Sequence, residues 1–420
     1  MLRKLGVGRL VFFEVLASRN NYRLIAKLKK QMYSLVFKKS FSHNGSHSSL
    51  WMKFIGNETI MADGGVLCRY HQGELFPIYQ FDRNIYLMQV AKNVLHILLY
   101  EPDQFFLWRF DGSLPEFSST ELQFYYENSK SEFGSYFIDL PDSSWETGIF
   151  DFNKNSHLFK GEKTKDYTVV NGNLFLSLDS NNLLVYRFSD SGDQLWNCQL
   201  PNRPFWEDNT GPSELRRDTI TKIIGLHNAL IWVATFSGSI YAINVDTGKI
   251  IYGVQNPDQE HVKDIWKKKF LTGKTQYSLN DVPSITKSVE FETSEFDAKN
   301  NMIFGLWMQK YWEFDVYRPN ESLRVVDIGG YLKQKNYQSL DFVSNSLPFD
   351  DEHIYTCESY QGIVLAINRK TLEIDWSYEI DIEPQGLLRK ILTVYYHNNQ
   401  LFVVDRENTL YVFEKINAST

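Results

Sequence analysis

Acidic side chains supply most of the chemistry that this 420-residue sequence offers. Three aspartates, Asp151, Asp297 and Asp350, each lie near the start of a strand-like run. Two suitably separated carboxylates can hydrolyse a glycosidic bond, one as the acid and the other as base or nucleophile. Because sequence spacing does not fix the separation of these groups, a carbohydrate-active site stands as an alternative to a binding function.

Metal and nucleophile chemistry have weaker signals. His43 and His47 share a stretch that contains Ser and Gly, but no third ligand is close, so no metal site is predicted. The sequence has no Gly-x-Ser-x-Gly elbow, phosphate-binding loop or His-Glu-x-x-His motif. We therefore expect no catalytic residues and no cofactor, and the chain is predicted not to be an enzyme.

Two other groups of side chains suit a protein interface. Tryptophan is a common interface anchor, and long segments between the strand-like runs contain Trp145, Trp206 and Trp266. Acidic residues occupy four equivalent turns, where they would form a negative rim for a basic partner or act only as turn formers. These four residues are Asp63, Asp179, Glu358 and Asp405.

The elements that position these residues are short strands in a repeating pattern. Between Thr221 and Gln255 the sequence predicts strands at 223–226, 229–235, 239–244 and 249–254, with Gly, Asn and Asp turn signals between them. The segment GSIYAIN at 238–244 recurs as GIVLAIN at 362–368, and a third copy lies at 186–196. The chain is therefore predicted to be a repeat protein whose unit is a four-stranded antiparallel sheet.

These copies resemble the repeat of the pyrroloquinoline-quinone-like (quinoprotein-type) β-propellers. That repeat has a strand ending in Ala-x-(Asp/Asn), a Thr-Gly turn and an aromatic residue that docks on the neighbouring blade. The residues that carry the resemblance are Ala242, Asn244, Thr247, Gly248 and Tyr252, then Ala366, Asn368, Thr371 and Trp376, with a weaker match at Ser191, Gly192 and Trp196.

The resemblance implies a fold and points to the non-enzymatic, protein-binding branch of the family. Quinoprotein dehydrogenases carry adjacent cysteines above the quinone and a set of calcium ligands. In this chain Cys68, Cys198 and Cys357 are far apart, and no calcium ligand set can be matched residue by residue. Resemblance in fold does not by itself assign an activity.

The repeat count predicts an all-β, seven-bladed β-propeller of four-stranded antiparallel blades, with the ring closed by strands from both termini. Eight blades are the alternative, if residues 121–139 form an irregular blade. Residues 1–30 are expected to form a helix or arm, and residues 31–420 a single propeller domain. Long insertions at 117–165, 201–220, 256–296 and 329–348 follow outermost strands and are expected to decorate one face, where they would bind a partner.

Composition limits the partner and the compartment. Lys+Arg 44 against Asp+Glu 51 gives a net charge of −7, so no affinity for nucleic acid is expected, and no apolar run is long enough for a membrane span. Three scattered cysteines fit a reducing compartment, so we expect a cytoplasmic protein, with the periplasm as the alternative.

Together these features favour a non-catalytic protein-binding β-propeller. We expect a bacterial scaffold or a cognate inhibitor, such as an immunity protein, that engages a basic toxin or an assembly component through its loop-decorated face. The alternative is a carbohydrate-active or quinone-dependent enzyme with its site in the central channel.

Overall fold

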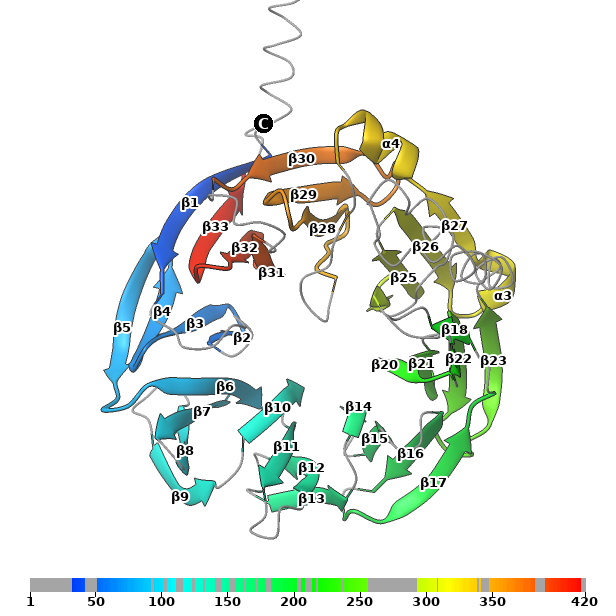
Figure 1. Cartoon of the computed structure of the whole chain (residues 1–420), viewed down its shortest axis with the longest axis horizontal. Coiled ribbons are helices and arrows are strands. Elements are labelled where there is room, and N and C mark those ends of the chain that lie inside the picture. Colours follow the sequence, from blue (N-terminus) through cyan, green and yellow to red (C-terminus); the bar gives the residue numbers. More distant parts are fainter. Residues whose placement is uncertain are drawn as a thin grey trace, which may run out of the picture. The chain divides into compact units, whose positions relative to one another are not determined.

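The described residues of the chain fold almost entirely into antiparallel β-sheets (Figure 1). It divides into two compact units, one of residues 1–40 with 348–420 and one of residues 41–347, and each is described by itself. Residues 1–30, expected as a helix or arm, lie outside the described residues. The computed structural model describes residues 32–41, 51–91, 94–101, 104–110, 116–122, 125–130, 133–139, 145–151, 154, 156–161, 164–170, 173–178, 183–189, 191–201, 205–207, 214–216, 218–235, 238–255, 293–307, 309–337, 340, 347–381 and 390–416.

The described part of the larger unit contains six four-stranded sheets, each a meander in which consecutive strands pair. The first three are β2–β5 (Met52–Ile55, Glu58–Asp63, Val66–His71, Glu74–Gln80), β6–β9 (Ile85–Ala91, Val94–Glu101, Gln104–Phe110, Glu116–Leu122) and β10–β13 (Tyr125–Lys130, Phe133–Asp139, Trp145–Asp151, Ser156–Gly161). The next three are β14–β17 (Thr164–Val170, Asn173–Leu178, Leu184–Phe188, Gln194–Gln199), β20–β23 (Ile220–His227, Leu230–Thr235, Ser239–Asn244, Ile250–Gln255) and β24–β27 (Glu295–Asp297, Met302–Trp307, Lys310–Asp315, Arg324–Asp327).

Three short elements decorate these sheets. They are the hairpin of β18 (Phe205–Glu207) and β19 (Glu214–Arg216), and the helices α3 (Pro319–Ser322) and α4 (Gly329–Gln334).

The smaller unit joins strands from the two ends of the sequence. Its first sheet contains β28 (His353–Glu358), β29 (Ile363–Asn368) and β30 (Ile374–Glu379). Its second has the order β1-β33-β32-β31, from β1 (Tyr33–Ser40), β31 (Ile391–His397), β32 (Gln400–Asp405) and β33 (Thr409–Lys415). Strand β1 pairs antiparallel with β33, from Tyr33 opposite Lys415 to Ser40 opposite Thr409. The expected pairing of the first strand with the last ones is confirmed.

The number of sheets differs from the expected seven. The described residues contain eight sheets of three or four strands, which matches the eight-blade alternative. The additional sheet is β10–β13, which occupies the segment expected as an insertion at 117–165. Its strands were hard to detect because they are polar and lack the Ala-x-Asn and Thr-Gly signals, as in the sequence YYENSK of β10. Its Phe133 and Ile149 nevertheless pack with Tyr167 of the next sheet, whose hydroxyl donates to the Phe133 carbonyl at 2.8 Å.

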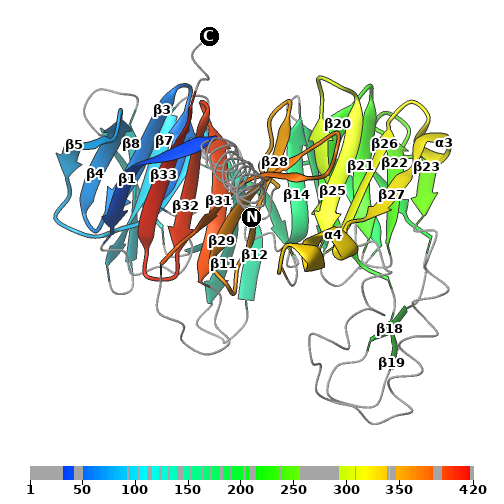
Figure 2. The same ribbon diagram turned by 90° about the horizontal axis from the view of Figure 1, so that it is seen from above.

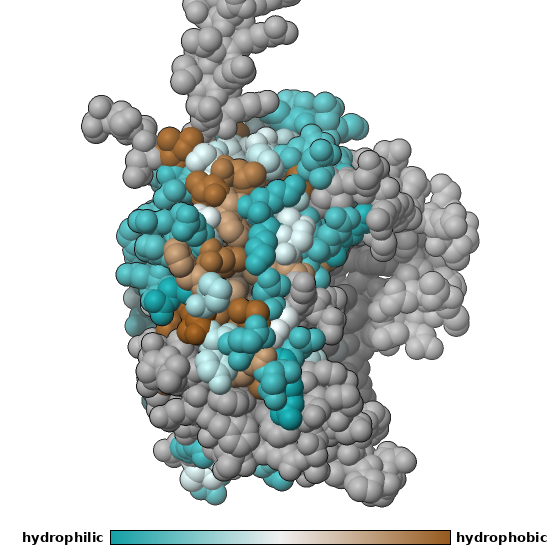
Figure 3. All heavy atoms as spheres, turned by 90° about the vertical axis from the view of Figure 1, so that its left-hand side faces the viewer, coloured by the Kyte–Doolittle hydropathy of each residue, from teal (hydrophilic) through white to brown (hydrophobic). Residues whose placement is uncertain are grey.

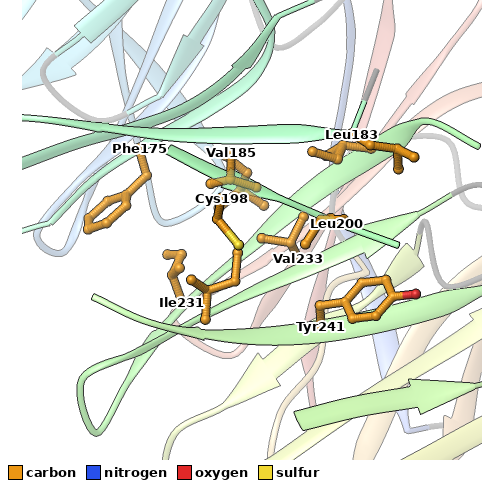
Figure 4. Packing of buried hydrophobic residues seen from close by; sticks show 11 residues of the cluster. Phe175, Leu183, Val185, Cys198, Leu200, Ile231, Val233 and Tyr241 are labelled. Carbon is orange, nitrogen blue, oxygen red and sulfur yellow. The ribbon is translucent and has the colours of Figure 1, made fainter. Parts of the chain in front are cut away.

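The aromatic residue of the repeat docks one sheet on the next, as expected. Trp196 donates from Nε1 to the carbonyl of Val245 at 2.6 Å, and its ring covers Gly248, where an added Cβ would lie 3.0 Å away. The buried cluster between β14–β17 and β20–β23 includes Val185, Cys198 and Ile231 (Figure 4). Burial raises the pKa of the Cys198 thiol to about 11, so this cysteine acts as a small apolar side chain.

The turn of the repeat is held by its asparagine. Oδ1 of Asn244 accepts hydrogen bonds from the N–H groups of Asp246 and Thr247, and Asn368 does the same for Lys370 and Thr371. Gly248 then adopts a φ of +66°, which glycine reaches without a steric cost. In the second copy the equivalent residue is Leu372, at a φ of +59°.

Candidate partner-binding face

Long connections follow three of the outermost strands in the larger unit. Strands β9 and β10 are separated only by residues 123–124, and β13 and β14 only by residues 162–163. By contrast, residues 200–219 follow β17, residues 256–294 follow β23, and residues 328–347 follow β27. In a four-stranded meander such a connection leaves from the same end as the turn between the second and third strands. Figure 2 shows the hairpin β18–β19 beyond one end of the strands of this unit.

The connection after β17 has its own secondary structure and firmly held ends. Trp206 of β18 is the register partner of Leu215 in β19. On one side of the hairpin, Leu200 is buried and its N–H donates to the carbonyl of Leu183 at 2.9 Å. On the other side, the buried Asp218 accepts a hydrogen bond from the N–H of Thr219 at 2.9 Å. The connection therefore begins and ends next to buried residues.

The connection after β27 begins with helix α4, which is pinned to its own sheet. The N–H of Ile328 donates to the carbonyl of Gln309 at 2.8 Å, and Leu332 is buried. A Cβ on Gly329 would lie 2.1 Å from the side chain of Gln309, so no other residue fits there without a shift. The exposed side of α4 carries Lys333, and Lys335 follows the helix.

The end of this connection is also fixed. The N–H of Leu347 donates to Oε1 of Glu295 at 2.9 Å. Lys222 of β20 donates to the same oxygen at 3.0 Å and to the carbonyl of Ser294 at 2.7 Å. One ion pair thus links the innermost strands of two sheets to the end of the long connection.

The four acidic residues expected to form a rim do not share one environment. Glu358 and Asp405 are only 2% and 1% exposed, and their carboxylates accept hydrogen bonds from the turns that follow them. Burial raises the pKa of Asp405, although donors from Thr409, Tyr411 and Glu407 oppose the shift. In this structure both carboxylates are buried and hold turns, and a role for them in partner binding stays a prediction. Asp63 ends β3 and is half-buried, and Asp179 lies outside the described residues.

The turn after Glu358 presents a residue that the sequence analysis missed. Tyr360 is 45% exposed, and the turn around it is held by the bond from the Gln361 N–H to Glu358 and by the bond from the Lys390 N–H to the Ser359 carbonyl at 2.7 Å. An aromatic side chain in a short, well-anchored turn loses little freedom on binding. Its signal in the sequence was an aromatic residue in the turn of a strong repeat copy.

Two of the three tryptophans expected at an interface lie in strands of the larger unit. The backbones of Trp145 and Trp206 lie at the start of β12 and in the middle of β18, and Trp266 lies outside the described residues. Their role in an interface stays a prediction.

Exposed apolar side chains also occur on the outer strands of the larger unit. They are Phe76 of β5, Leu195 of β17 and Ile251 of β23. Apolar side chains (brown) lie among hydrophilic ones (teal) on the face that Figure 3 presents. Because these three residues belong to different sheets, we assign no single docking surface to them.

The aspartates of the enzymatic alternative have a common local role. Asp151, Asp297 and Asp350 are each at least half-buried, and one oxygen of each accepts hydrogen bonds from backbone N–H groups two or three residues later. This is the turn-forming behaviour expected of aspartate. Within the part of the chain that the structure describes, no group of three or more His, Cys, Asp or Glu residues is arranged to hold a metal ion.

Comparisons with known proteins identify the fold. No protein-family model and no curated protein matches the sequence. The structure of BamB from Moraxella catarrhalis, a pyrroloquinoline-quinone-like β-propeller, matches with a TM-score of 0.51 at 10% identity, over 91% of this chain and 99% of that chain. Sqt1 from Saccharomyces cerevisiae matches with a TM-score of 0.50 at 10% identity, over 91% and 99%. The computationally designed Ika8 protein matches with a TM-score of 0.51 at 10% identity, over 90% and 99%.

The chain is therefore a β-propeller of four-stranded antiparallel sheets, as expected from the sequence. At 10% identity these similarities show the fold alone. None of the helices among the described residues has the length and apolar character needed to cross a bilayer.

Proposed function

We propose that this protein is a non-catalytic β-propeller that binds another protein through the connections after β17, β23 and β27. The observation that carries the proposal is the hairpin β18–β19, a separate element built into a connection that begins and ends at the buried residues Leu200 and Asp218. Loops on a rigid scaffold are the usual place for binding residues. The resemblance to the pyrroloquinoline-quinone-like repeat supports membership of the non-enzymatic branch of that family.

The partner that fits best is a basic protein. The chain carries a net charge of −7, which favours encounter with a positively charged surface. A cytoplasmic bacterial scaffold and an immunity-type inhibitor of a toxin are the two forms of the proposal. In either form Trp206 is the aromatic anchor that we would test.

The decisive experiment replaces residues 202–217 by a short Gly-Ser linker, because the anchors at Leu200 and Asp218 stay in place. The full-length protein and this variant are cross-linked in extracts of the native host, and the captured partner is then purified and its affinity measured by calorimetry. A matched control is Tyr317→Ala, which removes an exposed aromatic residue from a turn between third and fourth strands. We expect the hairpin variant to lose the partner and the control to keep it.

Equal affinity of the partner for all three proteins would contradict the proposed face. If no partner is captured and the purified protein instead turns over sugars or a quinone substrate, the enzymatic alternative replaces the binding function.

A further inference from the structure

A charge network in the smaller unit contains an imidazole that the proposed binding function does not use. His353, the first residue of β28, is buried. Its Nε2 atom lies 3.0 Å from Oδ2 of Asp375. Its Nδ1 atom lies 3.7 Å from Oδ1 of Asp350 and 3.9 Å from Oε2 of Glu352. Carboxylates therefore face both nitrogens of one buried ring.

This arrangement favours the doubly protonated ring. A neutral imidazole has one N–H group and one lone pair, so either tautomer would direct its lone pair at a carboxylate. Only the imidazolium presents a proton and a positive charge on both sides. Burial alone would lower the pKa of His353, but the neighbouring carboxylates of Asp350 and Asp375 outweigh it and the net shift is upward.

Asp350 connects this ring to the N-terminal strand. Its Oδ1 accepts hydrogen bonds from the N–H groups of Glu352 and His353, at 2.8 and 2.7 Å. Its Oδ2 accepts one from the hydroxyl of Tyr355 at 2.7 Å, and Tyr33 in turn donates to that hydroxyl at 2.6 Å. Tyr33 is the first residue of β1, so a chain of hydrogen bonds runs from the backbone N–H of His353 through Asp350 and Tyr355 to the start of this strand. The imidazole itself faces Asp350 as a charge, with Nδ1 at 3.7 Å from Oδ1.

A second link reaches the same place from β33. Nζ of Lys415 lies 3.4 Å from Oδ2 of Asp350 and 3.1 Å from Oε2 of Glu352. Lys415 is the register partner of Tyr33 in the β1–β33 ladder. Both residues of this pair are therefore connected to Asp350: Tyr33 through the hydroxyl of Tyr355, and Lys415 directly.

We infer that His353 is a pH-sensitive latch for strand β1: its protonated ring holds Asp350 in place, and loss of that proton loosens Tyr33 and the start of β1. The charges around the ring agree with this role. With a protonated ring, two cations, His353 and Lys415, lie against the three carboxylates of Asp350, Glu352 and Asp375, and deprotonation leaves only Lys415 to balance them. Arg369 contacts the same residue through its backbone, with Nη1 3.1 Å from the Asp350 carbonyl.

The neighbouring tyrosine hydroxyl groups do not change their charge in the pH range in which His353 titrates. Burial is the largest cause that raises the pKa of Tyr33 and Tyr355, and it raises the pKa of Tyr396 to about 12. All three therefore stay neutral around pH 7. Because the pKa of His353 is higher in the folded state than in the unfolded state, its contribution is complete below the unfolded value and is lost as the pH rises through the folded value.

The experiment is hydrogen exchange of the full chain, read by mass spectrometry on a peptide that covers β1 and on a reference peptide that covers β3. Rates are measured from about pH 6 to about pH 9 and corrected for the intrinsic pH dependence of exchange. Loss of one proton on opening predicts that protection of β1 falls by up to about tenfold per pH unit between the ordinary histidine pKa of about 6.5 and the higher folded-state pKa of His353, and that it levels off above the folded value. Protection of β3 should not follow this profile.

Three variants distinguish a specific effect of His353 on β1 from a general loss of stability. In His353→Gln, which does not titrate, we expect weaker protection of β1 with no pH-dependent fall. Asp375→Asn changes a side chain that is 41% exposed, keeps the fold and moves the fall to lower pH because one carboxylate is lost. His227→Gln alters a half-buried histidine of the larger unit and should leave the profile unchanged.

Two results would overturn the inference. One is a fall in β1 protection that is the same in the wild type and His353→Gln. The other is a ring titration of His353, followed by NMR in the wild-type protein, whose midpoint lies at or below the ordinary histidine value of about 6.5.

Discussion

The carboxylate of Asp405, at the end of β32, accepts three hydrogen bonds from the turn that follows it and from β33. The donors are the N–H groups of Glu407 and Thr409, both at 2.8 Å, and the hydroxyl of Tyr411 at 3.0 Å. Asp405→Ala removes the acceptor and leaves buried donors unpaired, so we expect it to lower the free energy of unfolding by roughly 2–4 kcal/mol. Urea unfolding followed by tryptophan fluorescence measures the change.

Glu407 supplies the control for this residue-scale prediction. It lies in the same turn but is exposed, so Glu407→Ala should change the free energy of unfolding by no more than about 0.5 kcal/mol. If the two alanine variants were equally stable, the carboxylate of Asp405 would have no structural role, and the acidic-rim interpretation would regain its support.

At the scale of the element, the repeat works by placing a tryptophan of one sheet on a glycine of the next. Gly248→Ala would introduce a Cβ 3.0 Å from the ring of Trp196 at a φ of +66°. Gly56→Ala meets nothing within 4 Å at a φ of +56°. Both substitutions impose backbone strain of about 1 kcal/mol, and only Gly248→Ala adds a steric clash.

We therefore expect Gly248→Ala to be less stable than Gly56→Ala by roughly 1–3 kcal/mol, measured by thermal or urea unfolding. The smaller ring of Trp196→Phe should remove most of the difference when combined with Gly248→Ala. An equal loss for both glycine variants would mean that Trp196 moves aside without cost.

The repeat copies also show which parts of the structure the sequence could reveal. Strands around Ala242 and Ala366 were predictable because runs of apolar and β-branched residues and the asparagine-held turns after them act locally. The sheet β10–β13 was predicted only as the alternative, because its stability comes from contacts with another sheet, such as that of Phe133 with Tyr167. In the same way, an acidic residue in a turn reads alike whether it faces solvent or, as for Glu358 and Asp405, the interior.

The contact between β10–β13 and the following sheet gives a further prediction at this scale. Tyr167→Phe leaves the carbonyl of Phe133 without its hydroxyl donor, so the free energy of unfolding should fall by about 1 kcal/mol. Tyr360→Phe, in an exposed turn, serves as the control and should be neutral. A neutral result for Tyr167→Phe as well would indicate that water replaces the lost hydroxyl.

At the scale of the whole chain, the smaller unit depends on the pairing of β1 with β33, two strands from opposite ends of the sequence. Strand β1 covers the edge of β33. Its Tyr33 packs on Trp376, with ring centroids 5.1 Å apart, and Trp376 packs in turn on Phe413 at 5.3 Å. Removal of β1 thus uncovers a strand edge and one side of an aromatic cluster.

A chain that starts at residue 42 should therefore unfold at a lower temperature than the full chain, and a peptide of residues 32–41 should restore part of the loss. Binding of the peptide to the folded state alone stabilises it by about 2.7 kcal/mol at a hundredfold excess over the dissociation constant. A peptide with proline in place of both Lys38 and Lys39 should fail. Alternate N–H groups of β1 point toward β33, so one of these two substitutions must remove an N–H group that donates to β33. Scanning calorimetry with each peptide measures the effect. Equal rescue by the two peptides would show that the ladder between β1 and β33 does not hold the ends of the chain together.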